Sequence, residues 1–165
     1  MTLFNSSPAD VIRSCKSIPD KEAVNLPHVV NRVSDPLPPP TECPFCAGEV
    51  RLVNNARFYG GREFGWPLAY ACRCGARVGC HPGTTIPLGT LADKATKDAR
   101  KCAHEAFDPL WKGKGPGMRR RAYQALQTAL ETENAHISWM GVEECTKVVK
   151  VCQQGLNLKE RHTHV

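Results

Sequence analysis

The sequence predicts an α+β protein, in which a small ribbon of short antiparallel strands follows an extended N-terminal arm and precedes about three α-helices. Two closely spaced cysteine pairs enclose a stretch with strand-like alternation, and four prolines stand ahead of them. In the second half of the chain, apolar residues recur at three- and four-residue spacings. The length of 165 residues fits one compact domain with an added arm.

Residues 1–42 are interpreted as the arm. Residues 8–15 are expected to form a short helix, because their apolar residues fall on one stripe. Residues 34–42 contain four prolines, which cannot donate backbone hydrogen bonds and favour an extended polyproline conformation. We therefore interpret this segment as a spacer, place a domain boundary after residue 42, and expect the ribbon to fold without the arm. A ligand for a proline-binding groove is the less favoured alternative.

Residues 43–90 are interpreted as the ribbon and a following loop. Strands are expected over residues 49–53, 66–72 and 76–80, between turn-forming asparagines and glycines. Residues 81–90 contain two prolines and two glycines, which exclude a regular element. A ribbon of this size has too small a core to be stable by itself.

Residues 91–155 are interpreted as a helical unit packed on the ribbon. Three helices are expected, over residues 90–110, 116–133 and 142–154. Thr90 is expected to begin the first, with Asp93 completing a shortened capping box. Residues 156–165 are interpreted as a frayed tail.

Nine cysteines are the most informative feature of the composition. Their number is odd, and the N-terminal residues lack the apolar core of a secretory signal, so we expect a cytoplasmic, reducing location. Clustered cysteines in such a compartment are metal ligands more often than disulfides. No stretch approaches the roughly 18 apolar residues of a membrane span, so no membrane partner is expected.

Four of the cysteines form the candidate metal site. Cys43 and Cys46 make one pair, and Cys72 and Cys74 make a second pair beyond the expected strands. Zn²⁺ needs four thiolate or imidazole ligands that converge tetrahedrally, and two turns that each carry two cysteines supply them. Such a closed site is structural rather than catalytic, because no coordination position remains for a substrate.

The spacing of the second pair leaves an alternative ligand set open. This pair is Cys-x-Cys rather than Cys-x-x-Cys, so its turn must be tighter. Cys80 and His81 follow closely and could replace one of its ligands. We place the four paired cysteines first, and a set that includes Cys80 or His81 second.

Three segments of the chain resemble a known family. They are CPFC at 43–46, YACRCGARVGCHPGTTIPLGTLAD at 70–93 and AHEAFDPLW at 103–111. Together they resemble a zinc-finger-containing domain family of unknown function, found largely in bacteriophage and prophage genomes. The resemblance runs from about residue 43 to the third expected helix, and implies zinc and a phage origin but no activity. The second pair of that family is normally Cys-x-x-Cys, so Cys72 stands one position off the pattern.

Basic and aromatic residues in the ribbon form the candidate binding surface. The net charge of +6 favours acidic partners weakly. Arginines interleaved with five aromatic residues suit single-stranded nucleic acid, with guanidinium groups on phosphates and rings on bases. Each ring has an equally weighted alternative role in the small core. The candidate binding arginines are Arg51, Arg57, Arg62, Arg73 and Arg77, with a second basic point at Arg119, Arg120 and Arg121.

Non-enzymatic nucleic-acid binding is the first function that these observations predict. A small phage effector that binds a host polymerase, nuclease or defence complex is the first alternative, and a nucleic-acid-processing enzyme is the second. His81, His104 and Asp108 suggest acid–base chemistry, but no spacing among them defines a catalytic triad or a phosphate loop. No small-molecule substrate is indicated.

Overall fold

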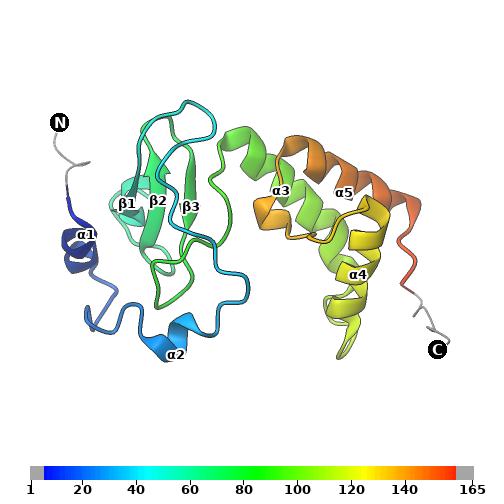
Figure 1. The fold of residues 1–165 in the computed structure, drawn as a ribbon, viewed down its shortest axis with the longest axis horizontal. Helices are drawn as coiled ribbons and strands as arrows, with labels where there is room; N and C mark the ends of the chain where they lie inside the picture. Colours follow the sequence, from blue (N-terminus) through cyan, green and yellow to red (C-terminus); the bar gives the residue numbers. More distant parts are fainter. Residues whose placement is uncertain (1–5, 159–165) are drawn as a thin grey trace. The chain divides into compact units, whose positions relative to one another are not determined.

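The chain divides into two compact units in the computed structural model, which describes residues 6–158. The first, Met1–Lys94, contains a three-stranded sheet and is called the ribbon unit. The second, Ala95–Val165, contains three α-helices among its described residues and is called the helical unit. The predicted α+β class is confirmed (Figure 1).

An antiparallel sheet with strand order β1-β2-β3 forms the centre of the ribbon unit. The strands are β1 (Val50–Asn54), β2 (Leu68–Cys72) and β3 (Arg77–Gly79). All three lie within two residues of their predicted bounds. Because alternate residues point to opposite faces, one face collects the apolar side chains of the main core. These sheet residues are Val50, Leu52, Leu68, Tyr70 and Cys72.

The N-terminal arm belongs to the ribbon unit. It begins with the predicted helix, α1 (Pro8–Ser14), which lies beside β1 (Figure 1). Val11, Cys15 and Ile18 are buried in the same core as the strands. The expected boundary after residue 42 therefore does not separate two compact units, because the chain ahead of the prolines returns to cover the sheet.

Glu63 ties the end of α1 to the connection between β1 and β2. Its carboxylate accepts hydrogen bonds from the backbone N–H groups of Lys16 and Ser17, both at 2.6 Å, and from the Asn54 side chain at 2.7 Å. Burial opposes the charge, but these hydrogen bonds outweigh it and lower the pKa of Glu63 to about 2.

A second attachment joins the arm to the loop after β3. The Asn25 N–H donates to the Gly83 carbonyl at 2.8 Å, and the Asn25 side chain accepts from the Thr85 N–H at 2.8 Å. The short helix α2 (Pro27–Val30) follows. A Cβ on Gly83 would lie 2.9 Å from Cγ1 of Val29, so only glycine permits this approach.

Backbone pairing along β3 explains why the first long helix begins later than predicted. The Arg77 N–H donates to the Ala92 carbonyl at 3.0 Å, and the Ala92 N–H donates to the Arg77 carbonyl at 3.2 Å. Leu91 is buried in the core of the ribbon unit. Residues 91–92 are thus fixed along the sheet edge, and α3 (Lys94–Phe107) begins four residues after Thr90.

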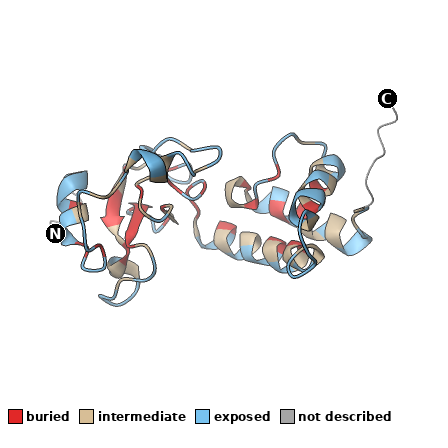
Figure 2. Cartoon of the chain, turned by 90° about the horizontal axis from the view of Figure 1, so that it is seen from below, coloured by how far each residue is buried: buried red, intermediate tan, exposed pale blue. Residues whose placement is uncertain are grey.

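The helical unit packs its helices around one apolar core. Besides α3 it contains α4 (Met118–Leu130) and α5 (Val142–Gln154). Two 3₁₀ turns lie in this unit, at Asp108–Leu110 and Ile137–Trp139, and a third lies in the ribbon unit, at Asn55–Phe58. Figure 2 shows buried residues recurring on one side of these helices. The core residues with 0% exposure are Ala103, Phe107, Ala122, Leu126 and Val148. The three predicted helices are confirmed, with α5 at its predicted bounds.

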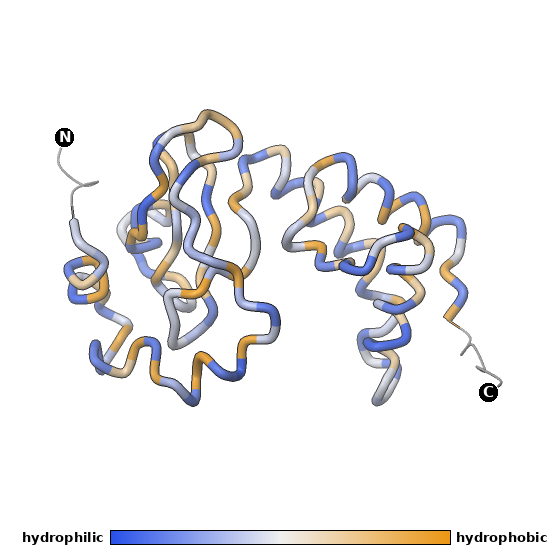
Figure 3. Tube along the Cα trace, viewed as in Figure 1, coloured by the Kyte–Doolittle hydropathy of each residue, from blue (hydrophilic) through white to orange (hydrophobic). Residues whose placement is uncertain are grey.

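Figure 3 shows hydrophilic and hydrophobic residues interspersed along the helices. Among the described residues, no helix is long and apolar enough to cross a membrane. The predicted tail begins at residue 156, and its part from residue 159 onward lies outside the described residues.

Candidate metal centre

The first cysteine turn precedes β1. The Cys43 N–H donates to the Gly48 carbonyl, and the Ala47 N–H donates to the Cys43 carbonyl, both at 2.9 Å. A bridge between Glu42 and Glu49 closes the turn at its base. The chain therefore reverses within a few residues, and this reversal brings the two cysteine side chains of the turn together.

The second cysteine turn is the hairpin between β2 and β3. The Cys72 N–H donates to the Ala76 carbonyl at 2.9 Å, and the Gly75 N–H donates to the Cys72 carbonyl at 3.1 Å. Gly75 has φ +97°, a conformation that other residues rarely adopt. This tight, glycine-dependent turn shows how a Cys-x-Cys pair fits where a longer spacing is usual.

Strand register brings the two turns together. Val50, which follows the first turn, lies opposite Cys72 at the start of the second. The Sγ atoms of Cys43 and Cys74 are 3.6 Å apart, and those of Cys46 and Cys72 are 3.5 Å apart. All four lie within 4.8 Å of one another. Ligands at about 2.3 Å from a tetrahedral Zn²⁺ stand about 3.8 Å apart, so the spacing fits a metal site.

Gly48 keeps space open beside the sulfurs. A Cβ at this position would lie 3.1 Å from the Cys46 Sγ and 3.2 Å from the Cys72 Sγ. Both distances are tighter than ordinary van der Waals contact. A side chain at residue 48 would therefore press on one sulfur from each pair.

The electrostatics of the cluster favour a cation at its centre. The Gly48 N–H lowers the pKa of Cys46, whereas the thiols of Cys72, Cys74 and Cys43 raise it, and the pKa of Cys46 is about 12. The neighbouring thiols thus oppose the ionisation of Cys46 when nothing balances its charge. A bound divalent cation would remove this opposition, because it attracts the Cys46 thiolate.

Cys80 and His81 lie away from this cluster. Cys80 follows β3, and its N–H donates to the carbonyl of Leu68 at the opposite end of β2 from Cys72. Strands rise about 3.3 Å per residue, so Cys80 is more than 10 Å along the sheet from the cysteine turns. Burial raises the pKa of Cys80 to about 12, as expected for a core thiol. The structure thus brings the four paired cysteines together and leaves Cys80 outside their cluster.

The five candidate arginines of the ribbon unit occupy three places. Arg51 and Arg77 flank Ala71 in one row across the sheet. Arg51 is 2.7 Å from Glu49, and the Arg77 guanidinium lies 4.6 Å from the centre of the Phe58 ring. The other three are exposed: Arg57 and Arg62 in the β1–β2 connection, and Arg73 in the second cysteine turn.

Three candidate arginines lie in the helical unit, in the first turns of α4. Arg119, Arg120 and Arg121 are all exposed. The Arg119 guanidinium lies 5.4 Å from the Trp111 ring and 5.5 Å from the Tyr123 ring. The structure thus fixes one of these three side chains against aromatic rings.

The aromatic residues of the ribbon divide between core and surface. Tyr70 is 7% exposed and belongs to the main core, and Phe58 packs on a small cluster on the other sheet face. By contrast, Tyr59 and Phe64 are 47% and 73% exposed. Phe45, which the sequence pattern did not single out, is 45% exposed in the first cysteine turn, between Cys43 and Cys46. Its position in a short turn between two closely spaced cysteines was the available signal.

The chain belongs to a family of zinc-finger-containing domains, whose family model matches residues 39–155. This confirms the family suggested by the three sequence segments, and the match spans both the four-cysteine cluster and the helices. No curated protein and no solved structure matches the chain.

Proposed function

We propose that Cys43, Cys46, Cys72 and Cys74 hold one structural Zn²⁺. The observation that supports this is the convergence of the four Sγ atoms, which lie 3.5–4.8 Å from one another. Gly48, which has no side chain, leaves room beside two of these sulfurs. Four thiolates leave no open coordination position, so the metal stabilises the fold and binds no substrate. Zinc binding in such small units supplies folding free energy on the order of 10 kcal/mol.

We further propose that the ribbon unit binds single-stranded nucleic acid through the β1–β2 connection. The observation that carries this proposal is an exposed aromatic pair, Tyr59 and Phe64, whose ring centres are 5.5 Å apart. Exposed Arg57 and Arg62 stand beside these rings in the sequence. Rings that stack on bases and guanidinium groups that contact phosphates are the two parts of a single-strand binding surface.

The pair is not explained by a role in the core. Phe58 and Tyr70 already pack on the two faces of the sheet, so the unit has its aromatic core without Tyr59 and Phe64. Gly60 and Gly61 adopt positive φ values of 61° and 84°, which fold the connection into a tight loop between the rings. Exposed apolar rings on such a loop are characteristic of a binding surface.

Arg57 and Arg62 are the best candidates for binding phosphates. Both are exposed on the connection that carries the aromatic pair, whereas Arg51 and Arg77 are half-buried within the strands of the sheet. Arg73 lies at the opposite end of the strands, beside the cysteines. It could extend the surface toward the metal site but does not share the loop with the aromatic pair.

Replacing Arg57 and Arg62 together with alanine tests the proposal. Binding to a single-stranded oligonucleotide should weaken, and the slope of log affinity against log salt should flatten by about 0.7 for each phosphate that the variant no longer neutralises. A matched variant that changes Arg13 and Arg32 to alanine removes the same charge from exposed positions outside this loop. Zinc content and melting temperature should stay near those of the unchanged chain in both variants.

Two results would contradict the proposal. One is equal weakening by both double variants, which would indicate net charge rather than a defined surface. The other is no binding by the unchanged chain at low salt. The exposed Phe64 would then point to a protein partner, whose packed apolar interface depends little on salt.

A further inference from the structure

A basic hollow lies at the start of α4 in the helical unit. It has a volume of about 400 Å³ and is lined by Gly117, Arg119, Arg120, Tyr123 and His136. Among the described residues that line it, none is acidic. The hollow is open to solvent, and its cationic lining selects for anions.

Aromatic contacts hold the Arg119 side chain in place at this hollow. The Arg119 guanidinium lies over the rings of Trp111 and Tyr123, at 5.4 and 5.5 Å from their centres. Tyr123 in turn meets the fully buried Phe107 edge to face, with ring centres 4.9 Å apart. Arg119 is therefore positioned before any ligand arrives, which reduces the entropy cost of binding.

His136, the second ring residue that lines the hollow, packs on another aromatic ring. The His136 ring lies 4.6 Å from the Trp139 ring, centre to centre. The His136 N–H donates to the Asn134 side chain at 3.1 Å, which fixes the backbone there. The hollow thus combines guanidinium groups with two rings, Tyr123 and His136, on which a planar group could rest.

The charges around the hollow are unfavourable for the helix alone. Three consecutive arginines lie in the first turns of α4, where the helix dipole already places positive charge. Within the described part of the chain, no side chain caps this helix, and its N-cap is Gly117 with φ 82°. A departure from local preference of this kind marks functional positions, and here a bound anion would relieve the repulsion.

We infer that this hollow binds the phosphate group of a nucleotide, with Arg119 and Arg120 on the phosphate and Tyr123 and His136 against the sugar or base. The same chemistry is presented by a free nucleotide and by a nucleotide within a strand. The inference does not depend on the ribbon surface, because its residues all belong to the helical unit.

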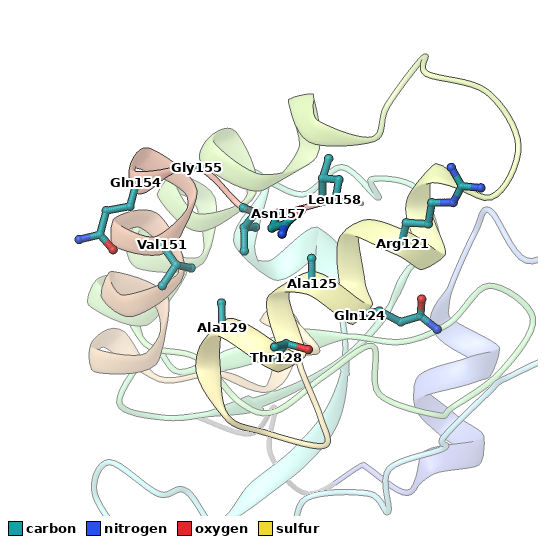
Figure 4. Close-up of a pocket in the computed structure, with 11 residues that line it drawn as sticks. Arg121, Gln124, Ala125, Thr128, Ala129, Val151, Gln154, Gly155, Asn157 and Leu158 are labelled. Atoms are coloured by element: carbon teal, nitrogen blue, oxygen red, sulfur yellow. The ribbon is translucent and has the colours of Figure 1, made fainter. Parts of the chain in front are cut away.

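Arg121 offers a matched control for Arg120. The two arginines are neighbours on α4 and both are exposed. Adjacent helical residues are rotated by about 100°, and Arg121 instead lines a separate groove of about 620 Å³ beside the segment after α5 (Figure 4). Arg120→Gln and Arg121→Gln therefore remove the same charge from the same helix, but only the first removes it from the hollow.

The experiment titrates the full chain with adenosine 5′-monophosphate, adenosine and a short single-stranded oligonucleotide. Calorimetry gives the affinity, and nuclear magnetic resonance follows the ring signals of His136 and Tyr123. The titration with the oligonucleotide uses the double variant in which Arg57 and Arg62 are replaced with alanine, so that the ribbon surface does not contribute. We expect the monophosphate to shift both ring signals, adenosine to bind at least about tenfold more weakly, and Arg120→Gln to weaken phosphate binding about tenfold or more.

Arg121→Gln should change that affinity by less than about twofold. Loss of oligonucleotide binding in Arg120→Gln would identify a strand as a source of the phosphate, and loss of monophosphate binding alone would identify a free nucleotide. Equal weakening by Arg120→Gln and Arg121→Gln would overturn the inference. The inference would also be overturned if none of the three probes shifted the ring signals of His136 and Tyr123.

Discussion

Glu63 illustrates how a single side chain determines the extent of the ribbon unit. In the sequence it is one of few acidic residues among the ribbon arginines, and nothing near it suggests a structural role. In the structure its carboxylate accepts from Lys16, Ser17 and Asn54, so it holds the end of α1 against the sheet. Two of its partners, Lys16 and Ser17, are more than forty positions away in the sequence. No local sequence pattern can reveal hydrogen bonds between residues so far apart.

Replacing Glu63 with glutamine should lower the free energy of unfolding by about 1–2 kcal/mol at pH 7, because the variant lacks the charge-assisted hydrogen bonds. The folded pKa of about 2 lies below the ordinary 4.5, so the contribution of the carboxylate is present above pH 4.5 and is lost as pH falls toward 2. Urea unfolding at several pH values measures this difference between the two chains.

Glu22→Gln is the control for the Glu63 variant, since Glu22 is exposed in the same unit. Its unfolding free energy should differ from that of the unchanged chain by less than about 0.5 kcal/mol. A Glu63 effect that stays constant between pH 7 and pH 3 would contradict the assigned pKa. Zinc content is measured at each pH, and the comparison uses the pH values at which all three chains keep their metal.

At the scale of elements, the strands, the long helices and the cysteine turns could be predicted because each depends on local pattern. Alternation defines β1, and paired cysteines beside glycines define the two turns. The covering of the sheet by α1 could not be predicted, because the proline run suggested a boundary and the contacts cross it. The division of aromatic residues into core and surface could not be predicted either. Strand register places Tyr70 in the core, whereas Phe64 lies in the β1–β2 connection and is exposed.

Deletion of residues 1–40 should destabilise the ribbon unit rather than leave it intact. The deletion removes Val11, Cys15 and Ile18 from the main core and exposes the side of β1 that α1 covers. Burial of side chains of this size contributes about 1.5–3 kcal/mol each, so the loss exceeds what a small unit can tolerate. Thermal unfolding should show a lower or absent cooperative transition.

Substitution of Phe45 with alanine provides a comparison for the deletion, because this ring is 45% exposed and makes no part of the core. Its melting temperature should stay near that of the unchanged chain. A truncated chain that keeps its zinc and its full melting temperature would show that the arm is a separate element after all.

At the scale of the whole molecule, the two units differ in what stabilises them. The helical unit has a core of large apolar side chains, including Phe107, Leu126 and Val148. The ribbon unit has short strands and many turns, and its two cysteine turns come together at one end of the sheet. Metal removal should therefore unfold the ribbon unit first and leave helical signal from the other unit.

Metal content of the freshly purified full chain, measured together with that of single cysteine variants, tests the central claim most directly. One Zn²⁺ per chain is expected, with zinc lost in Cys72→Ser and Cys74→Ser and kept in Cys102→Ser, which changes an exposed cysteine of the helical unit. Less than about half an equivalent of zinc in the unchanged chain, or zinc kept in Cys72→Ser but lost in Cys80→Ser, would contradict the four-cysteine site.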